Sequence, residues 1–240
     1  MCSALDHGVA AWATIMLRAC HKFSVSYKIV AWYTLGVAEP GLRDLKKART
    51  RRLIADTAAR LFAERGYERV TVSEIARAAE VAEQTLYNYF PTKEQLVTDR
   101  EQQIQQQLDD LIRSRPAGTS PAAAIRDLVL QNVSAIRDTQ PEIARGTLGY
   151  LAAISPAVNR LALELTDRQA TALAAAIGET SPITPEIARL QGIALAGVFQ
   201  IIISESGRRA REGQTPAEIA DALHPRIENI LTELDRWLTR

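Results

Sequence analysis

Residues 46–96 have the sequence KKARTRRLIADTAARLFAERGYERVTVSEIARAAEVAEQTLYNYFPTKEQL. The pattern predicts three short helices joined by tight turns. Over residues 49–65 the apolar residues recur every three or four positions, which gives a helix one apolar face. Gly66 follows as a helix-ending residue. Two further helices are predicted over residues 71–79 and 82–90, so the stretch has the layout of a helix-turn-helix unit.

The third helix of this stretch carries the candidate functional face. Leu86 and Phe90 are four residues apart and are expected to anchor the helix. The remaining, outward positions are polar or aromatic: Glu83, Gln84, Thr85, Tyr87, Asn88 and Tyr89. Carboxylates and amides can bond to base edges, and hydroxyls can donate to phosphate. A solvated polar face is the alternative, but the turn and the capping box of Thr71 with Glu74 favour reading of a DNA groove.

The run from Thr71 to Leu96, and above all TLYNYFPTKE at residues 85–94, resembles the DNA-binding domain of the TetR family of bacterial transcriptional regulators. The resemblance covers about residues 48–108. It implies an N-terminal three-helix DNA-binding domain with its reading motif at 71–90. The implied DNA-contacting residues are Thr71, Ser73, Glu83, Gln84, Thr85, Tyr87, Asn88, Tyr89 and Lys93, with Tyr87, Tyr89 and Lys93 as phosphate anchors.

Two positions depart from the family pattern. Glu80 stands in the turn where the family usually has glycine, and Ala82 stands where a serine or similar residue caps the reading helix. A left-handed backbone is less favourable for glutamate than for glycine. Loss of a serine or threonine cap costs about 1 kcal/mol. We therefore expect a reading helix that is less firmly held before DNA is bound.

Charge is distributed unevenly along the chain. The 240 residues carry a net charge of only +1. Between residues 43 and 52, however, six basic residues stand against a single acidic one, Asp44. A basic segment of this kind is suited to phosphate or minor-groove contact, with a solvated tail as the alternative. The length leaves room for a second, helical domain, predicted over residues 109–240.

The first 42 residues differ in composition from the rest. They hold both cysteines and both methionines, and their apolar runs, 9–17 and 29–38, are too short to span a bilayer. We interpret them as an N-terminal extension. The favoured reading is that residues 1–36 come from a start site placed too early, with Val37 as the true start. A genuine extension with a peripheral hydrophobic role is the alternative.

The sequence carries no enzyme motif, so we expect a protein that is not an enzyme and that has no cofactor. There is no H-E-x-x-H, no G-x-S-x-G and no glycine-rich phosphate loop. Cys2 and Cys20 suggest neither a disulfide framework nor a metal site. His224 lacks a nearby catalytic partner and is expected to be a packing or surface residue. A cytoplasmic location without membrane contact is predicted.

The remaining sequence predicts an all-α protein. Thr92, with Gln95 as its partner, is expected to cap a helix to residue 113. Further helices are predicted at 122–138, 141–153, 156–177, 185–211 and 215–238, the last kinked or split by Pro225. The last two are long and apolar, which favours a homodimer over burial in the chain's own core. The resemblance implies that they form a four-helix bundle with their copies, and that the dimer binds a palindromic, double-stranded DNA operator.

The resemblance also implies a ligand cavity among the middle helices. Polar residues among apolar neighbours are the candidates for lining it: Arg145, Tyr150, Gln200 and Ser204. The composition favours an apolar or amphipathic small-molecule effector of unknown identity. The expectation is a homodimeric repressor released by that effector. The alternative is a helical small-molecule-binding protein without DNA function, for which the acidic Glu80 and Glu83 are the support.

Overall fold

The computed structural model of the protein describes residues 41–239. The chain divides after Arg49 into two units, and each is described by itself. Helix α3, Leu42–Arg65, crosses this division. It begins earlier than the predicted position 49, so the basic residues 43–52 are helical. The predictions for residues 1–36 and for a start at Val37 concern positions outside the described range.

Helix α3 from Thr50 onward packs with α4, Val72–Ala78, and α5, Glu83–Tyr89, and we call these helices the head. Their core holds Ile54, Ala58, Leu61, Phe62, Ile75, Ala76, Ala79, Leu86 and Phe90. In α4, Ala76 lies in this core, whereas Ala78 is exposed. Residues 75, 76 and 79 share one helical face, whereas residue 78 points away from it.

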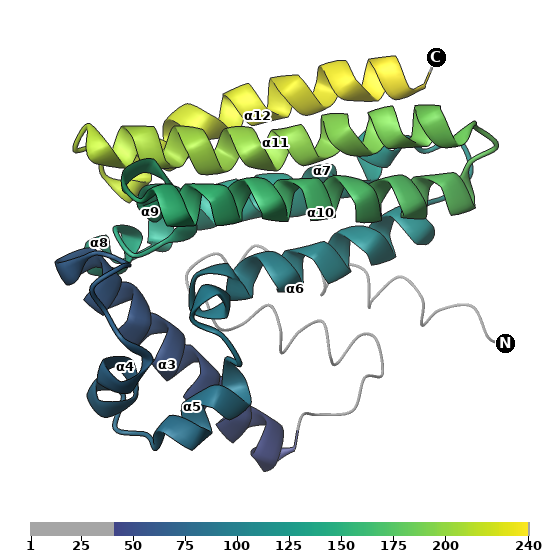
Figure 1. Ribbon diagram of the computed structural model, residues 1–240. Coiled ribbons are helices and arrows are strands. Elements are labelled where there is room, and N and C mark those ends of the chain that lie inside the picture. The colour runs from purple at the N-terminus through teal and green to yellow at the C-terminus, as the bar shows by residue number, and fades with distance from the viewer. Residues whose placement is uncertain (1–40, 240) are drawn as a thin grey trace, which may run out of the picture. The chain divides into compact units, whose positions relative to one another are not determined.

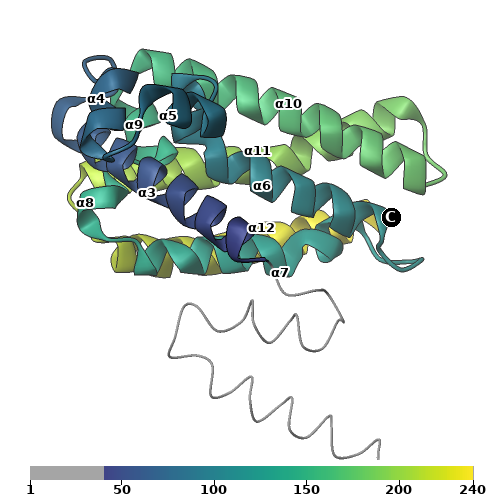
Figure 2. The same ribbon diagram turned by 90° about the horizontal axis from the view of Figure 1, so that it is seen from below.

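The remaining helices form the body. In chain order they are α6 (Lys93–Arg113), α7 (Pro121–Ser134), the 3-10 turn η2 (Ala135–Asp138), α8 (Pro141–Ala144), α9 (Leu148–Ile154), α10 (Pro156–Thr180), α11 (Pro185–Arg211) and α12 (Pro216–Leu238). Helices α10, α11 and α12 lie side by side, with α6 along α10 and α7 along α12 (Figures 1 and 2). Every regular element of the described residues is a helix, which confirms the all-α prediction.

One predicted helix, 141–153, is in fact two. Helices α8 and α9 are separated by Arg145, Gly146 and Thr147. A Cβ atom built on Gly146 would lie 1.9 Å from the carbonyl oxygen of Ala59 in α3. The backbone of the head thus occupies the space that any other side chain at 146 would need. A tertiary contact of this kind leaves no periodic signal in the sequence.

The predicted side-chain cap at Thr92 is wrong, and the predicted split at Pro225 is not observed. Thr92 is the N-cap of α6, but its side chain makes no capping hydrogen bond. Pro225 does not split the last helix, which runs unbroken over Pro216–Leu238. Pro225 and Asp221 are both exposed, so the Asp221 carbonyl that loses its helical donor faces water. Thr215 caps this helix, with a full capping box to Glu218.

Buried residues form two clusters, and one of them crosses from head to body. The body cluster lies among α6, α7, α10, α11 and α12. The head cluster contains the head core together with Leu148, Leu151, Val158 and Ala162 of α9 and α10. At the same junction, the Ser155 hydroxyl donates to the carboxylate of Glu68. The head therefore shares its core with the first turns of α9 and α10.

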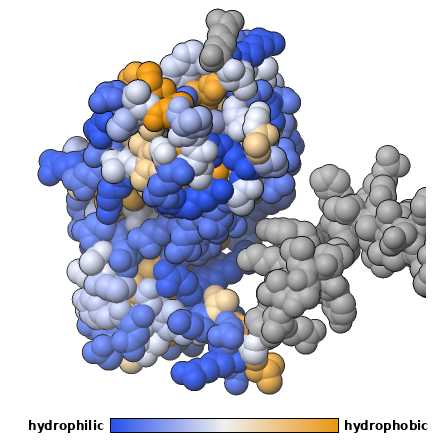
Figure 3. All heavy atoms as spheres, turned by 90° about the vertical axis from the view of Figure 1, so that its right-hand side faces the viewer, coloured by the Kyte–Doolittle hydropathy of each residue, from blue (hydrophilic) through white to orange (hydrophobic). Residues whose placement is uncertain are grey.

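Helix α11 is unusually apolar for its length. It has 27 residues and a window of mean hydropathy 1.6, which by length and composition alone would suffice to cross a membrane. In the structure it packs along α9, α10 and α12. Its opposite side leaves Leu190, Ile193 and Ile201 exposed. Space-filling atoms show hydrophobic patches interrupting a largely hydrophilic surface at the end of the body where α12 terminates (Figure 3).

Candidate nucleic-acid interface

The turn that leads into α5 has the strained and uncapped features predicted for it. Glu80 has φ of 54°, the one positive φ found at a non-glycine position among residues 41–239. The N–H of Val81 donates to the carbonyl of Ala76 at 3.0 Å and closes the turn. Ala82 is the N-cap of α5 in an extended conformation and makes no side-chain cap. The first turn of α5 thus begins with backbone donors that no capping side chain satisfies.

Helix α5 presents a continuous polar face on the side away from its anchors. Leu86 and Phe90 are fully buried. On the opposite side the exposed residues are Glu83, Gln84, Tyr87 and Asn88. The Gln84 amide nitrogen donates to the Asn88 side-chain oxygen at 3.3 Å, so these two amides already lie together. Four of the six predicted face residues therefore share one open surface with acceptors and donors of the kind that bond to base edges.

The other two face residues, Thr85 and Tyr89, are half-buried rather than fully outward. The ring of Tyr89 packs against the head cluster. Its backbone carbonyl accepts a 2.9 Å hydrogen bond from Arg51. Any DNA contact by Tyr89 would therefore come from the exposed edge of a residue that also holds α5 in place.

Arg51 fixes the end of α5, which sequence reasoning did not foresee. Besides the carbonyl of Tyr89, its guanidinium donates to Asp99 of α6, with an Nε to Oδ1 distance of 2.9 Å, and lies 4.5 Å from the centre of the Phe90 ring. Three helices thus meet on one side chain. The sequence showed Arg51 only as one member of a basic run, and nothing in the spacing distinguished it from its neighbours.

Thr71 and Ser73 lie at the start of α4. The Thr71 hydroxyl accepts from the N–H of Glu74 at 3.2 Å, and the Glu74 carboxylate accepts from the N–H of Thr71 at 2.8 Å. These bonds confirm the predicted capping box. The backbone N–H of Thr71, followed by its hydroxyl, holds the pKa of Glu74 below its usual value. Thr71 is exposed and Ser73 half-buried, so both a structural role and a phosphate contact are open to Thr71.

Lys93 is turned toward the head rather than outward. Its ammonium donates to the backbone carbonyl of Tyr67 at 2.6 Å and lies 4.3 Å from the centre of the Tyr67 ring. Burial lowers the pKa of Lys93. In this state the side chain ties the start of α6 to the turn at Gly66, whose φ is 83°. Its bond to the Tyr67 carbonyl uses one of the three ammonium donors, so two remain for a phosphate.

The four candidate effector residues lie in different surroundings. Arg145 is exposed after α8, and Ser204 is exposed on α11 with its hydroxyl donating to Ile201 of the same helix. Tyr150 packs against the head cluster. Gln200 accepts a 2.7 Å hydrogen bond from Thr166 of α10. Only Gln200 is thus bonded across the interface of two body helices.

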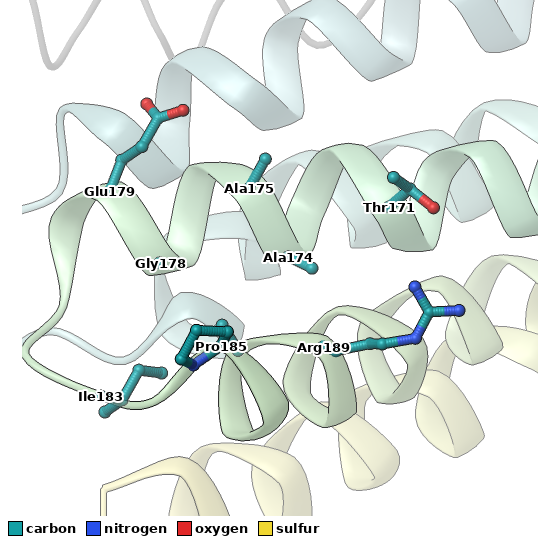
Figure 4. Close-up of a pocket in the computed structure, with 9 residues that line it drawn as sticks. Thr171, Ala174, Ala175, Gly178, Glu179, Ile183, Pro185 and Arg189 are labelled. Atoms are coloured by element: carbon teal, nitrogen blue, oxygen red, sulfur yellow. The ribbon is translucent and has the colours of Figure 1, made fainter.

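An open pocket of about 470 Å³ lies near the loop between α10 and α11 (Figure 4). Thr171 and Glu179 of α10 and Arg189 of α11 are among its lining residues, whereas none of the four candidate effector residues lines it. Among the residues that the structure describes, no three metal-ligating side chains gather into a possible ion site.

A short two-helix unit with an exposed polar second helix, held by a third helix, defines a helix-turn-helix protein. Residues 54–99 match the family described as "Bacterial regulatory proteins, tetR family". The matched stretch comprises most of the head and the first turns of α6.

Two curated relatives share part of the chain. The HTH-type transcriptional regulator TcmR of Streptomyces glaucescens is 34% identical over 109 residues, which cover 45% of this chain and 48% of TcmR. The uncharacterized HTH-type transcriptional regulator YuxN of Bacillus subtilis is 24% identical over 186 residues, or 75% of this chain and 62% of YuxN. The chain therefore spans about half the length of TcmR and less than two thirds of YuxN.

Solved structures resemble the fold at low identity. Native NalD, the secondary repressor of the MexAB-OprM multidrug efflux pump in Pseudomonas aeruginosa, matches with a TM-score of 0.49 and 20% identity over 75% of this chain and 96% of NalD. A putative TetR-family regulator from Mesorhizobium loti matches with a TM-score of 0.45 and 20% identity, over 78% of this chain and 96% of its own.

Proposed function

We propose that this protein is a cytoplasmic transcriptional regulator, without enzymatic activity, that binds a palindromic DNA operator as a homodimer and leaves it when a small-molecule effector binds. The exposed face of α5 carries this proposal, since Glu83, Gln84, Tyr87 and Asn88 project together from a short helix anchored by Leu86 and Phe90. A helix of this size fits the major groove, and two copies related by a two-fold axis read two half-sites.

The exposed side of α11 supports the homodimer. Gly197 follows Leu190 by seven residues, which is two helical turns, and precedes Ile201 by four, so the three share one face. Leu190 is 53% exposed and Ile201 38% exposed. A Cβ atom built on Gly197 would meet nothing within 4 Å. An apolar stripe with a glycine at its centre allows the same helix of a second copy to approach closely.

Effector release follows if the effector binds more tightly to a conformation whose two α5 helices are wrongly spaced for the operator. The shared head cluster and the contact of Gly146 with Ala59 support such coupling, because they join the body to the head without an intervening linker. Of the predicted effector residues, the place of Gln200 between α10 and α11 supports its role best.

The function is tested by selecting sequences from a random double-stranded DNA pool with the full chain at low salt. Enrichment of a palindrome is the expected result. If no DNA binds even at low salt, the alternative function, a helical small-molecule-binding protein without DNA function, is favoured. The acidic Glu80 in the turn and Glu83 on the exposed face of α5 are the observation behind this alternative.

Base preference should change when the tip of α5 is altered. We expect Glu83→Ala and Gln84→Ala each to change the preferred base pairs, since a side chain that bonds to base edges contributes about 1–3 kcal/mol of discrimination. Glu83 suits the amino group of cytosine. Selection from the random pool with each variant measures the change. An unaltered motif from both variants would show that these side chains do not read bases.

Loss of a phosphate anchor should weaken binding to all DNA sequences about equally. Tyr87→Phe and Lys93→Ala are expected to lower affinity without changing base preference, and Lys93→Ala should also lower the salt slope of binding by about one unit. Exposed Arg168 of α10 provides the control, because Arg168→Ala should leave the slope unchanged. If Lys93→Ala lowers the melting temperature but not the slope, Lys93 serves only to hold the Tyr67 carbonyl.

A further inference from the structure

The inner face of α6 carries two polar residues where apolar ones are expected. Glu101 lies seven and eleven residues before Leu108 and Ile112, which places all three on one side of the helix. Gln105 follows Glu101 by four residues on the same side. Leu108 and Ile112 are completely buried in the body cluster. Glu101 and Gln105 therefore face the interior of the body.

Both residues have an oxygen atom that is buried without a hydrogen-bond partner. These atoms are Oε2 of Glu101 and Oε1 of Gln105. The Gln105 amide nitrogen donates to Asp109 at 2.8 Å, so its oxygen is left pointing away from that bond. A buried acceptor without a donor costs free energy, and a buried carboxylate costs most. Desolvation raises the pKa of Glu101 to about 7.

Contacts of α6 with α10 and α7 indicate which residues lie at the level of these two oxygens. Arg113 of α6 pairs with Glu179 of α10, and Arg100 of α6 donates to Asn132 of α7 at 3.2 Å. Helices α6 and α10 run in the same direction (Figure 1), and Arg113 meets Glu179 at their C-terminal ends. Glu101 is twelve residues before Arg113, and the residue twelve before Glu179 is Asp167, so the level of Glu101 on α10 is close to Thr166. Thr166 is the residue that donates to Gln200 of α11. The unpartnered oxygens thus lie at the level of the best-placed candidate effector residue.

We propose that Glu101 and Gln105 recognise an organic cation, an apolar molecule bearing a protonated amine, amidine or guanidine, as the effector. The inference rests on the proposed function, since it names the chemistry of the ligand that would release the operator. A nitrogen cation supplies the N–H donors that both oxygens lack and neutralises the carboxylate. The surrounding body cluster offers the apolar body of the ligand a matching environment.

A metal ion does not suit the same position. Hard cations such as Mg²⁺ and Ca²⁺ require about six or more oxygen ligands, and transition metals favour histidine or cysteine. The described residues provide no such group. One carboxylate and one amide oxygen on an otherwise apolar helix face match a single cationic nitrogen better.

Calorimetric titration of the full chain without DNA tests the proposal. The probes are benzamidine, 4-phenylbutylamine and 1-naphthylmethylamine, each paired with a neutral analogue: benzamide, 4-phenylbutan-1-ol and 1-naphthylmethanol. We expect the wild type to bind at least one cation about tenfold more tightly than its neutral analogue, the gain of a charge-assisted hydrogen bond. Glu101→Gln should reduce this preference to within about twofold.

The matched control is Glu164→Gln, at an exposed carboxylate on α10, which should retain the preference. No preference for any cation, or a preference that survives Glu101→Gln, overturns the proposal. Because the titration contains no DNA, failure to bind an operator would count against the proposed function and leave the cation result standing.

A second measurement keeps the proposal open to failure if Glu101→Gln alters the fold. The unfolded chain releases the Glu101 proton near its ordinary pKa of 4.5, whereas the folded protein holds it to about 7. The free energy of unfolding therefore falls as the pH rises from about 4.5 to about 7. The melting temperature of the wild type should fall more steeply from pH 5 to 8 than that of Glu101→Gln. Equal slopes would show that the carboxyl is not buried, and would overturn the proposal.

Other charged groups near this level do not pair with Glu101. Asp99 and Arg100 are its neighbours on α6, and Arg100 is bonded to Asn132. On the facing helices the charged residues nearest this level are Arg126 and Asp127 of α7 and Glu164, Asp167 and Arg168 of α10. Arg126 donates to Thr232 of α12, and the other four are exposed. The difference in slope between wild type and Glu101→Gln therefore reports on Glu101.

Discussion

Ile201→Glu is expected to convert the proposed dimer to a monomer and to lower affinity for a full palindrome about 10²–10⁴-fold, toward that of one half-site. A carboxylate placed in an apolar helix interface would be buried without a partner, at a cost of several kcal/mol. Ile201 is 38% exposed in the single chain, so its own subunit should keep its fold. Ile230 of α12 is a less suitable site, because it packs against the body cluster.

Sedimentation and operator binding of the same samples provide the measurement. Leu163→Glu, at a 51% exposed residue of α10, is the control for placing a charge on an apolar surface position outside α11 and α12. It should leave the dimer intact. A folded Ile201→Glu dimer with wild-type affinity would show that the two copies meet through other helices.

Gly207→Ala is expected to lower the free energy of unfolding by about 3 kcal/mol, at the upper end for an added core methyl group. A Cβ atom at Gly207 of α11 would lie 2.0 Å from the carbonyl oxygen of Gly149 in α9. The added methyl group is fixed to the backbone of α11 and would clash with the backbone of α9. The clash is relieved only if α9 and α11 separate. Such separation would also disturb the head cluster, to which Leu148 and Leu151 of α9 belong.

Urea unfolding followed by circular dichroism gives the stability difference. Gly178→Ala in α10 is the matched control, since its Cβ would make an ordinary 3.6 Å contact with Ala188. This control should be neutral or slightly stabilising, because alanine favours helix over glycine by about 1 kcal/mol. Equal stabilities of Gly207→Ala and wild type would mean that α9 and α11 adjust without cost.

The parts of the fold that depend on neighbouring residues in the sequence could be predicted. The capping boxes at Thr71 and Thr215, the bounds of α11 and the missing cap at Ala82 follow from local hydrogen bonding and periodicity. The close approach of Gly146, between α8 and α9, to the backbone of Ala59 could not be predicted, because the two residues are 87 positions apart in the sequence.

The same distinction applies to the candidate site. The open face of α5 was predicted from spacing, whereas the bonds of Arg51 to α5 and α6 depend on three helices meeting in space. The inward position of Lys93 is likewise a tertiary contact. For the effector, Arg145 and Ser204 were chosen as polar residues among apolar ones, without regard to which helix face they occupy. Helix periodicity in α6 would have singled out Glu101.

The shared head cluster limits how segments of this chain can be exchanged with those of other proteins. Leu148, Leu151 and Val158 complete the core of the head, and Ser155 bonds to Glu68. A chimera that joins residues 50–108 to the body of another protein would leave these contacts unfilled. The transplantable module is therefore discontinuous in sequence: the head must travel with α9 and the first turns of α10, and a successful graft requires compatible surfaces at both.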